Sequence, residues 1–395
     1  MSTPIHIVMV TRVLPHHSIG GMQAVAWDLA TEFVRRGVTV TILTATIPGM
    51  PEQFRDAGVN IRALRGTTWQ RYGKHWWRET RRVFERELLS TCSLVFSISA
   101  GGFSLLPLRS RMPQIPFVLQ AHGTSVGELI SKWKSGSLRG ILTSSRNAVW
   151  IARDLAAYPK FDAIVSVGRR VSEDFEIWPV RQFVDKARLR LIPNGIDTRV
   201  FFPNPTARIR LRSELGWSRD LRIVVSASRL HKQKGIDLGL KAFAQLARTT
   251  GNMRYLIIGD GPESQALKRM TEQMSLGGLV RFTGGLSRET MADYLNAADA
   301  MLFTTRRVEG NPLNILEALA VGLPVIASSH LRQTVPPSKA IVLVNERDAA
   351  EVSSALHGTF SREAPRESLL PQELSMIESA RAHLALFDEL IARRH

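Results

Sequence analysis

The sequence contains very little cysteine and has no long apolar segment. Cys92 is the only cysteine among 395 residues, which excludes an intramolecular disulfide, and no CxxC or Cys/His cluster suggests a zinc site. No run of about 18 apolar residues occurs, and residues 1–10 lack a charged segment before their apolar stretch. These absences predict a protein of the reducing cytoplasm, without a membrane-spanning anchor or an export signal.

Acidic residues are scarce relative to basic ones. The chain has 52 Lys and Arg but 35 Asp and Glu, a formal net charge of +17 at pH 7. Such an excess indicates anionic partners, which include nucleic acid, phosphorylated small molecules and acidic membrane surfaces. The bias lies mainly in residues 1–190, which hold 26 basic and 14 acidic residues. The hydrophobic fraction of 44% excludes a disordered chain.

What is present is a repeated alternation of apolar strands and amphipathic helices. The β-branched run 5–10 is followed by Gly20-Gly21, a helical pattern over 24–36 and a second strand over 38–43. Further strands are expected at 94–98, 117–120, 163–167, 189–192, 222–227, 255–258, 280–282, 300–303, 325–327 and 341–344. The pattern predicts an α/β chain of two Rossmann-like, doubly wound parallel-sheet domains facing each other across a cleft.

A proline-containing segment separates the two alternations. Residues 193–197 have the composition of a turn, and residues 201–208 carry two prolines. We therefore expect one Rossmann-like domain over residues 1–198 and a second over residues 199–371. Residues 372–395 are expected to form a C-terminal helix that packs back on the N-terminal domain.

The most informative segment runs from Glu309 to Glu317. Asn311 suits an N-cap and Pro312 the first helical position, so a short helix is expected to begin there. Free N–H groups and the helix dipole attract an anion, and two carboxylates beside that anion suit the hydroxyl groups of a sugar nucleotide. The alternative is a solvated loop residue at Glu309 and a capping role for Glu317.

A basic cluster follows the strand over 222–227. Arg229 comes just after the strand and Lys234 just before a helix that begins at Gly235, so both are expected at the carboxyl edge of the sheet. A guanidinium can hold a diphosphate through two N–H donors, and an ammonium adds a compact charge. The alternative is a solvated basic loop. The segment 259–261 lacks the third glycine of a dinucleotide fingerprint, so it predicts a tight turn.

Taken in order, these motifs resemble the retaining glycosyltransferases of family 4, which have the GT-B fold. The resemblance rests on Arg229 with Lys234-Gly235, on 258–263, on Glu309 and Glu317 with seven residues between them, and on 322–325. In the N-terminal half it rests on Gly20-Gly21 and on 192–197. It spans about residues 5–327.

The resemblance implies a role for each residue. The matching Arg229 and Lys234 hold the donor diphosphate, Glu317 binds the nucleotide ribose, and Glu309 contacts the donor sugar. His122 lies near the transferred sugar, with a purely structural histidine as the alternative. The catalytic set is thus Glu309, His122, Arg229 and Lys234. The donor-binding set is Gly20, Gly21, Arg229, Lys234, Gly310, Asn311, Pro312, Leu313, Asn314 and Glu317.

The implied activity is that of a retaining hexosyltransferase. It moves a sugar from a UDP- or GDP-sugar to a lipid-linked or cell-surface glycan intermediate of lipopolysaccharide, exopolysaccharide or glycolipid synthesis. No Asp-x-Asp pair offers a place for a metal that bridges the diphosphate, so neither a metal nor a cofactor is expected. An epimerase or phosphorylase of the same fold is the alternative. A basic nucleic-acid-binding protein is more remote, because no groove-reading motif occurs.

Residues 69–88 form a basic and aromatic amphipathic stretch. Such a segment can lie in an anionic membrane interface, which predicts peripheral contact with the inner face of the cell membrane. The alternative is an ordinary domain helix whose apolar side faces its own sheet. The aromatic and apolar members are Trp69, Tyr72, Trp76, Trp77, Val83, Phe84 and Leu88, and the basic members are Arg71, Lys74, Arg78, Arg81, Arg82 and Arg86.

Overall fold

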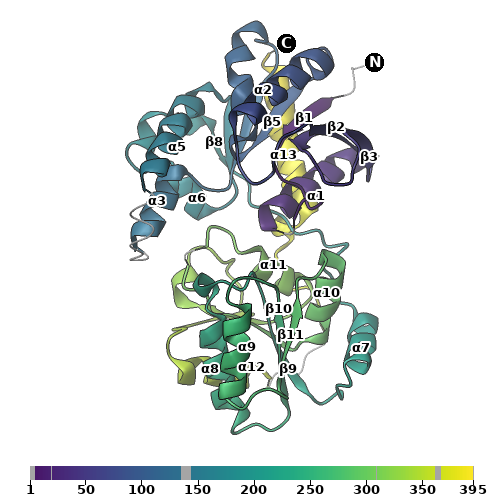
Figure 1. Cartoon of the computed structure of the whole chain (residues 1–395), viewed down its shortest axis with the longest axis vertical. Helices are drawn as coiled ribbons and strands as arrows, with labels where there is room; N and C mark the ends of the chain where they lie inside the picture. The colour runs from purple at the N-terminus through teal and green to yellow at the C-terminus, as the bar shows by residue number, and fades with distance from the viewer. Residues whose placement is uncertain (1–4, 19, 135–143, 308, 361–365, 395) are drawn as a thin grey trace. The chain divides into compact units, whose positions relative to one another are not determined.

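The computed structural model describes residues 5–18, 20–134, 144–307, 309–360 and 366–394 of the chain. It divides the chain into two compact units. Unit 1 comprises Met1–Gly195 and Met376–His395, and unit 2 comprises Ile196–Ser375. Each unit has its own sheet and helices, coloured by residue number in Figure 1.

Within the described residues, the sheet of unit 1 has eight strands in the order β3-β4-β2-β1-β5-β6-β7-β8. Neighbouring strands run parallel, except that β3 pairs antiparallel with β4. Strands β5 and β6 are buried throughout, because helices cover both faces of a parallel sheet. The strands are β1 (His6–Val10), β2 (Thr39–Ala45), β3 (Gln53–Asp56), β4 (Val59–Leu64), β5 (Leu94–Ile98), β6 (Phe117–Ala121), β7 (Ala163–Ser166) and β8 (Leu189–Leu191).

The helices of unit 1 come mostly from the first half of the chain, but one comes from its end. They are α1 (Gly21–Arg35), α2 (Lys74–Val83), α3 (Ser125–Lys134), α5 (Ser144–Ala157), α6 (Arg169–Asp174) and α13 (Met376–Ala392). A π-helical turn (Phe84–Leu88) continues α2, and a 3₁₀ segment (Ser99–Arg111) joins β5 to β6.

Helix α13, yellow in Figure 1, packs beside α1 in unit 1. The Phe387 ring lies 5.8 Å from that of Phe33 on α1 and 5.2 Å from that of Phe96 on β5, measured between centroids. All three rings are fully buried. The end of the chain therefore completes the core of the unit that the beginning of the chain builds.

In the described part of unit 2, six parallel strands follow the order β11-β10-β9-β12-β13-β14. The strands are β9 (Arg222–Ala227), β10 (Met253–Ile258), β11 (Val280–Gly284), β12 (Ala300–Phe303), β13 (Val325–Ser328) and β14 (Ile341–Val344). The helices are α7 (Pro205–Glu214), α8 (Ile236–Ala247), α9 (Ser264–Gln273), α10 (Arg288–Ala297), α11 (Leu313–Ala320) and α12 (Ala349–Phe360). Side chains cap several of them; the Asn204 side chain, for example, accepts a hydrogen bond from the Ala207 N–H at the start of α7.

The two mainly parallel sheets confirm the predicted α/β class. Strands β5, β9, β12 and β14 have the bounds expected from the sequence, and the other predicted strands differ by a few residues at their ends. The hairpin of β3 and β4 was not predicted. Strand β3 lies at the edge of the sheet, and its residues are exposed or half-buried, so it lacks the apolar run that marks the central strands.

Candidate functional site

The loop after β9 is tied to the loop after β12 at the carboxyl edge of the unit 2 sheet. The Gln233 carbonyl accepts hydrogen bonds from the Arg306 N–H (2.8 Å) and the Thr305 hydroxyl (3.1 Å). The Arg306 guanidinium also makes two bonds to the Asp237 carboxylate on α8, at 2.6 and 2.7 Å. These contacts join two strand ends that are neighbours in the sheet.

Gly235 makes this approach possible. Its φ of +64° lies in the left-handed region, and a Cβ atom there would stand 1.8 Å from the Thr304 carbonyl oxygen. The Thr304 hydroxyl donates to the Gly235 carbonyl at 2.8 Å. A side chain at position 235 would therefore both strain the backbone and push the two loops apart.

Lys234 and Glu309 meet where these loops join. Lys234 Nζ lies 2.7 Å from Glu309 Oε1, and 22% and 16% of the two side chains remain exposed. Arg229 is exposed, and its guanidinium has no hydrogen-bond or carboxylate partner among the described residues. The structure thus brings together two of the predicted catalytic residues, with a third close along the chain.

Helix α11 begins one residue later than expected. Pro312, and not Asn311, is the N-cap, and the helix starts at Leu313 without a side-chain cap. The prediction was wrong because proline at 312 adopts an extended ψ of 91°, outside the helical range. Asn314, in the first turn, donates through Nδ2 to the Ala227 carbonyl at the end of β9, at 2.7 Å. This bond fixes the start of α11 beside the loop that carries Arg229.

Glu317 lies in the middle of α11 and is 6% exposed. The helix ends in two hydrogen bonds, from the Gly322 N–H to the Leu319 carbonyl and from the Leu323 N–H to the Ala318 carbonyl. That pair is the Schellman arrangement expected from a glycine after a helix. The predicted role of Glu317 in ribose binding stays a prediction, as do the backbone contacts expected from Gly310.

The segment 259–261 forms a tight turn after β10. Gly259 has a φ of +130°, and a Cβ atom there would lie 1.9 Å from the Ser228 carbonyl oxygen. The Leu230 N–H donates to the Asp260 carbonyl at 2.9 Å. The turn therefore supports the backbone on both sides of Arg229.

In unit 1, Gly20 and Gly21 lie where α1 begins. Gly20 is the N-cap, in extended backbone that any residue adopts, and Gly21 is the first residue of the helix. The predicted approach of a diphosphate to these glycines stays a prediction.

His122 follows β6 directly. Its Nε2 lies 3.1 Å from Oε1 of Gln120, the second-last residue of β6. Burial, together with the smaller effect of the nearby His383, lowers the pKa of His122 to about 4. The imidazole is therefore neutral at pH 7 and can act through a neutral nitrogen.

Arg12 is a candidate that the sequence reasoning missed. It lies two residues beyond β1, and its guanidinium stands 4.4 Å from the centre of the Tyr72 ring. Its Nε is buried and has no hydrogen-bond partner in the part of the chain that the structure describes. Burial lowers the pKa of this guanidinium. A cation just after the first strand was a signal that could have marked it.

The aromatic side of the 69–88 stretch packs into unit 1. Trp76 on α2 is 2% exposed, and Tyr72 stacks on Trp77 with 5.0 Å between ring centres. Arginines of α2 lie on the outside, with 72% of the Arg78 side chain and 41% of the Arg81 side chain exposed. The structure therefore has the arrangement of an ordinary domain helix, whose outer side is basic.

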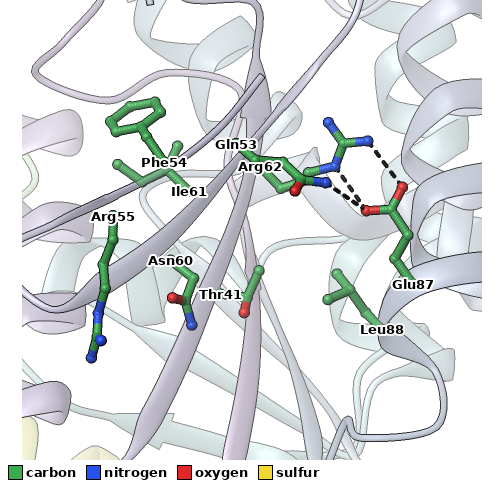
Figure 2. A pocket seen from close by; sticks show the side chains of 9 residues that line it. All are labelled: Thr41, Gln53, Phe54, Arg55, Asn60, Ile61, Arg62, Glu87 and Leu88. Atoms are coloured by element: carbon green, nitrogen blue, oxygen red, sulfur yellow. Dashed lines mark hydrogen bonds and ion pairs between the residues drawn. The ribbon is translucent and has the colours of Figure 1, made fainter. Parts of the chain in front are cut away.

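A pocket of about 400 Å³ opens beside the β3–β4 hairpin, and none of the predicted catalytic or donor-binding residues lines it. Figure 2 shows the Arg62 guanidinium from β4 paired with the Glu87 carboxylate from the π-helical turn, through contacts of 2.8 and 2.9 Å. The charges of Arg62 and Glu87 are therefore paired with each other. We assign the pocket no part in the candidate site.

In the described residues, no helix combines the length and the apolar character needed to cross a membrane. Likewise, no group of three or more His, Cys, Asp or Glu side chains in those ranges is arranged to hold a metal ion.

Two family profiles match the chain in succession. Residues 19–200 match "Glycosyltransferase Family 4", and residues 207–359 match "Glycosyl transferases group 1". The second profile covers the loops that carry Lys234 and Glu309, and the first covers His122.

Curated relatives share part of the chain. A GDP-mannose-dependent alpha-(1-6)-phosphatidylinositol monomannoside mannosyltransferase of Mycolicibacterium smegmatis is 33% identical over 268 residues, which are 65% of this chain and 64% of that protein. The putative colanic acid biosynthesis glycosyltransferase WcaL of Escherichia coli K12 is 29% identical over 253 residues, 60% of each chain. The matched part thus spans less than two thirds of these relatives.

Among solved structures, sucrose-phosphate synthase from Thermosynechococcus elongatus superposes with a TM-score of 0.76 at 21% identity. The alignment covers 98% of this chain and 100% of that one. At this identity the similarity establishes the fold alone, which is the two-sheet arrangement of GT-B enzymes.

Proposed function

We propose, from the premise that this chain belongs to glycosyltransferase family 4 and has the GT-B fold, that it transfers a sugar from a nucleoside-diphosphate sugar to a glycolipid or lipid-linked glycan. The transfer retains the configuration of the anomeric carbon, as the family implies. In this proposal the product is an intermediate of a cell-surface polysaccharide or a glycolipid.

The observation that carries the proposal is the contact between Lys234 and Glu309, with the exposed Arg229 in the same loop as Lys234. A solvated basic loop needs no such contact, whereas a donor site needs cations for a diphosphate and a carboxylate for sugar hydroxyl groups. Hydrogen bonds to the backbone carbonyls of Gln233 and Gly235 hold both loops in place. The site is therefore organised before a ligand arrives, which favours charge stabilisation in the transition state.

In the proposed reaction, all the bonds that form and break belong to the two substrates, and the protein residues bind them and stabilise charge. The bond between the anomeric carbon and the phosphate oxygen breaks, the acceptor oxygen bonds to that carbon, and the acceptor proton passes to the departing phosphate. Arg229 and Lys234 stabilise the negative charge that develops on the leaving diphosphate, without a metal ion. Glu309 holds the donor sugar, and Glu317 holds the ribose.

We propose a guanosine or uridine nucleotide as the donor, with GDP-mannose to be tested first. The M. smegmatis relative is named for GDP-mannose and for a phosphatidylinositol acceptor, and a Streptococcus pneumoniae relative is named alpha-monoglucosyldiacylglycerol synthase. Both names contain a lipid, phosphatidylinositol in the first and diacylglycerol in the second. A lipid acceptor also suits the basic excess of residues 1–190.

The acceptor side of the proposal lies in unit 1. Arg12, two residues beyond β1, has a buried Nε–H donor without a hydrogen-bond partner among the described residues, and such a cation suits an anionic group such as a phosphate on the acceptor. The outer side of α2 adds exposed arginines that suit the anionic inner face of a cell membrane. Peripheral contact through this basic side, without inserted aromatic rings, is therefore the form of membrane association that we propose.

Thermal-shift measurements with GDP, UDP and their sugars, followed by a transfer assay with a membrane lipid extract, test the function. We expect one nucleotide to raise the melting temperature and its sugar to label a lipid, in the presence of EDTA as well as in its absence. Turnover of the donor without any acceptor would support an epimerase instead. Sugar 1-phosphate formed from a glycan and phosphate would support a phosphorylase.

A further inference from the structure

His122 is the first member of a chain of polar contacts that ends on the C-terminal helix. His122 Nε2 lies 3.1 Å from Gln120 Oε1, and Gln120 Nε2 lies 3.4 Å from His383 Nε2. His383 Nδ1 lies 2.7 Å from the Ser379 carbonyl oxygen, one turn earlier on α13. Every group in this series of contacts belongs to unit 1.

The Ser379 carbonyl, at one end of this series of contacts, determines the direction of each hydrogen bond in it. A carbonyl oxygen only accepts, so His383 Nδ1 must carry the proton. In a neutral ring the other nitrogen, Nε2, is then an acceptor, and the Gln120 amide must donate to it. Gln120 Oε1 is left as the acceptor for His122, whose Nε2 must therefore carry a proton.

The surroundings of His383 keep its ring neutral. The side chain is fully buried, and its ring meets Phe33, Phe96 and Phe387 edge-on at 6.2, 5.6 and 6.0 Å between centres. Burial among these rings lowers the pKa of His383 to about 4. A doubly protonated ring would have two donors and would face the Gln120 amide with the wrong polarity.

We propose that Gln120 and His383 are positioning residues that hold His122 as the tautomer with a proton on Nε2 and a free electron pair on Nδ1. No hydrogen-bond partner for His122 Nδ1 occurs among the described residues. A nitrogen of this kind accepts a hydrogen bond and donates none. It therefore suits a hydroxyl group of a substrate and rejects a carbonyl or phosphate oxygen at the same place.

This meaning for catalysis rests on the proposed sugar transfer, in which His122 lies near the transferred sugar. The tautomer itself does not rest on it, because the three contacts are made within unit 1 and involve no substrate. In the proposed reaction, Gln120 and His383 act through His122 and touch no substrate.

We call the hydrogen-bonded series His122, Gln120 and His383 the relay. Two matched substitutions at position 383 distinguish its hydrogen bonds from the packing of the His383 ring. His383→Gln keeps an oxygen acceptor at about the reach of Nε2, whereas His383→Leu fills the phenylalanine cage without an acceptor. Gln120→Met removes the middle of the relay at similar volume, and it serves as the second test where His383→Leu fails to fold.

The direct readout is the ¹⁵N NMR spectrum of the full-length protein labelled with ¹⁵N-histidine. The chain has 10 histidines, and the signals absent from His122→Asn assign His122. We expect wild type and His383→Gln to show a protonated Nε2 and an unprotonated Nδ1 at His122. His383→Leu and Gln120→Met should show exchange between the two tautomers. A protonated Nδ1 in wild type, or an unchanged tautomer in both relay variants, would overturn the proposal.

The activity assay adds a second readout. We expect His383→Leu and Gln120→Met to lower kcat about 10-fold, as for the loss of one hydrogen bond in the transition state, with little change in the KM for the donor. His383→Gln should stay within about threefold of wild type. Absence of sugar transfer by the wild-type protein would refute the proposed function alone, because the NMR result does not depend on turnover.

Discussion

Replacing Lys234 by methionine tests the candidate donor site most directly. The substitution removes the ammonium that lies 2.7 Å from Glu309 and keeps most of the side-chain volume. The Lys234 side chain also lies over the Phe303 ring, with Nζ 5.7 Å from the ring centre, and the methionine can keep that apolar contact. The change therefore removes charge with little change in packing.

The exposed fractions set the expected cost in stability. A surface ion pair contributes about 0–1 kcal/mol, and breaking a fully buried pair costs about 3–5 kcal/mol. With 22% and 16% of the side chains exposed, the pair of Lys234 and Glu309 falls between these limits, so we expect a loss of about 1–2 kcal/mol. A domain of ordinary stability, about 5–15 kcal/mol, stays folded after such a loss.

The expected cost in catalysis is much larger. Loss of a preorganised group that stabilises the leaving diphosphate lowers the rate by about 100- to 1,000-fold. Steady-state kcat/KM for the donor, with a urea unfolding curve for each variant, separates the two effects. Lys232→Met is the matched control, because Lys232 is exposed and lies with Lys234 in one 3₁₀ turn (Lys232–Lys234). A folded Lys234→Met with kcat/KM within threefold of wild type, or an equal loss in Lys232→Met, would refute the assignment.

Gly235, His383 and the basic outer side of α2 can each be tested by substitution. Gly235→Ala should destabilise the protein by at least about 2 kcal/mol in urea and abolish turnover, whereas Gly251→Ala, which has open space, should stay within about 0.5 kcal/mol; equal effects would contradict the role of Gly235. The folded-state pKa of His383 is about 4 against about 6.5 when unfolded, so the unfolded chain binds more protons between these values and stability falls as pH drops from 6.5 toward 4. Between pH 7 and pH 5, the free energy of unfolding of His383→Gln should therefore fall by up to about 2 kcal/mol less than that of wild type. An equal fall in both proteins would argue against a neutral buried ring. The double reversal Arg78→Glu/Arg81→Glu should weaken sedimentation with phosphatidylglycerol vesicles about 10-fold or more, whereas Arg269→Glu/Arg281→Glu in unit 2 should change it little; equal losses would point to net charge alone.

The sequence predicted those parts of the fold whose burial leaves a strong local pattern. Strand β12 is a continuous apolar run and β9 is mainly apolar and buried, and the bounds of both match the prediction. The contact of Lys234 with Glu309 is different, because 75 residues separate the two along the chain. Their order in a family motif suggested a shared site, but the hydrogen bonds of Gln233 and Thr304 that bring them together leave no local pattern.

Two features of unit 1 could not be decided from the sequence, because both depend on tertiary packing. The aromatic residues of 69–88 have the periodicity of any amphipathic helix, and the same pattern fits a membrane surface and a protein core. Burial of Trp76 decides between them, and burial depends on tertiary packing. The partnership of Gln120 with His383 spans 263 residues, so no motif links them.

The return of α13 to unit 1 has a consequence for the order of events during synthesis. Unit 2 is one continuous segment, whereas unit 1 needs Met376–Ala392 to close the cage of Phe33, Phe96 and Phe387. On the ribosome, the second unit therefore emerges whole before the first has all its parts. Until α13 leaves the exit tunnel, Phe33 and Phe96 lack the Phe387 ring and Gln120 lacks His383. In the proposed arrangement, His122 is therefore held in one tautomer only after α13 has packed.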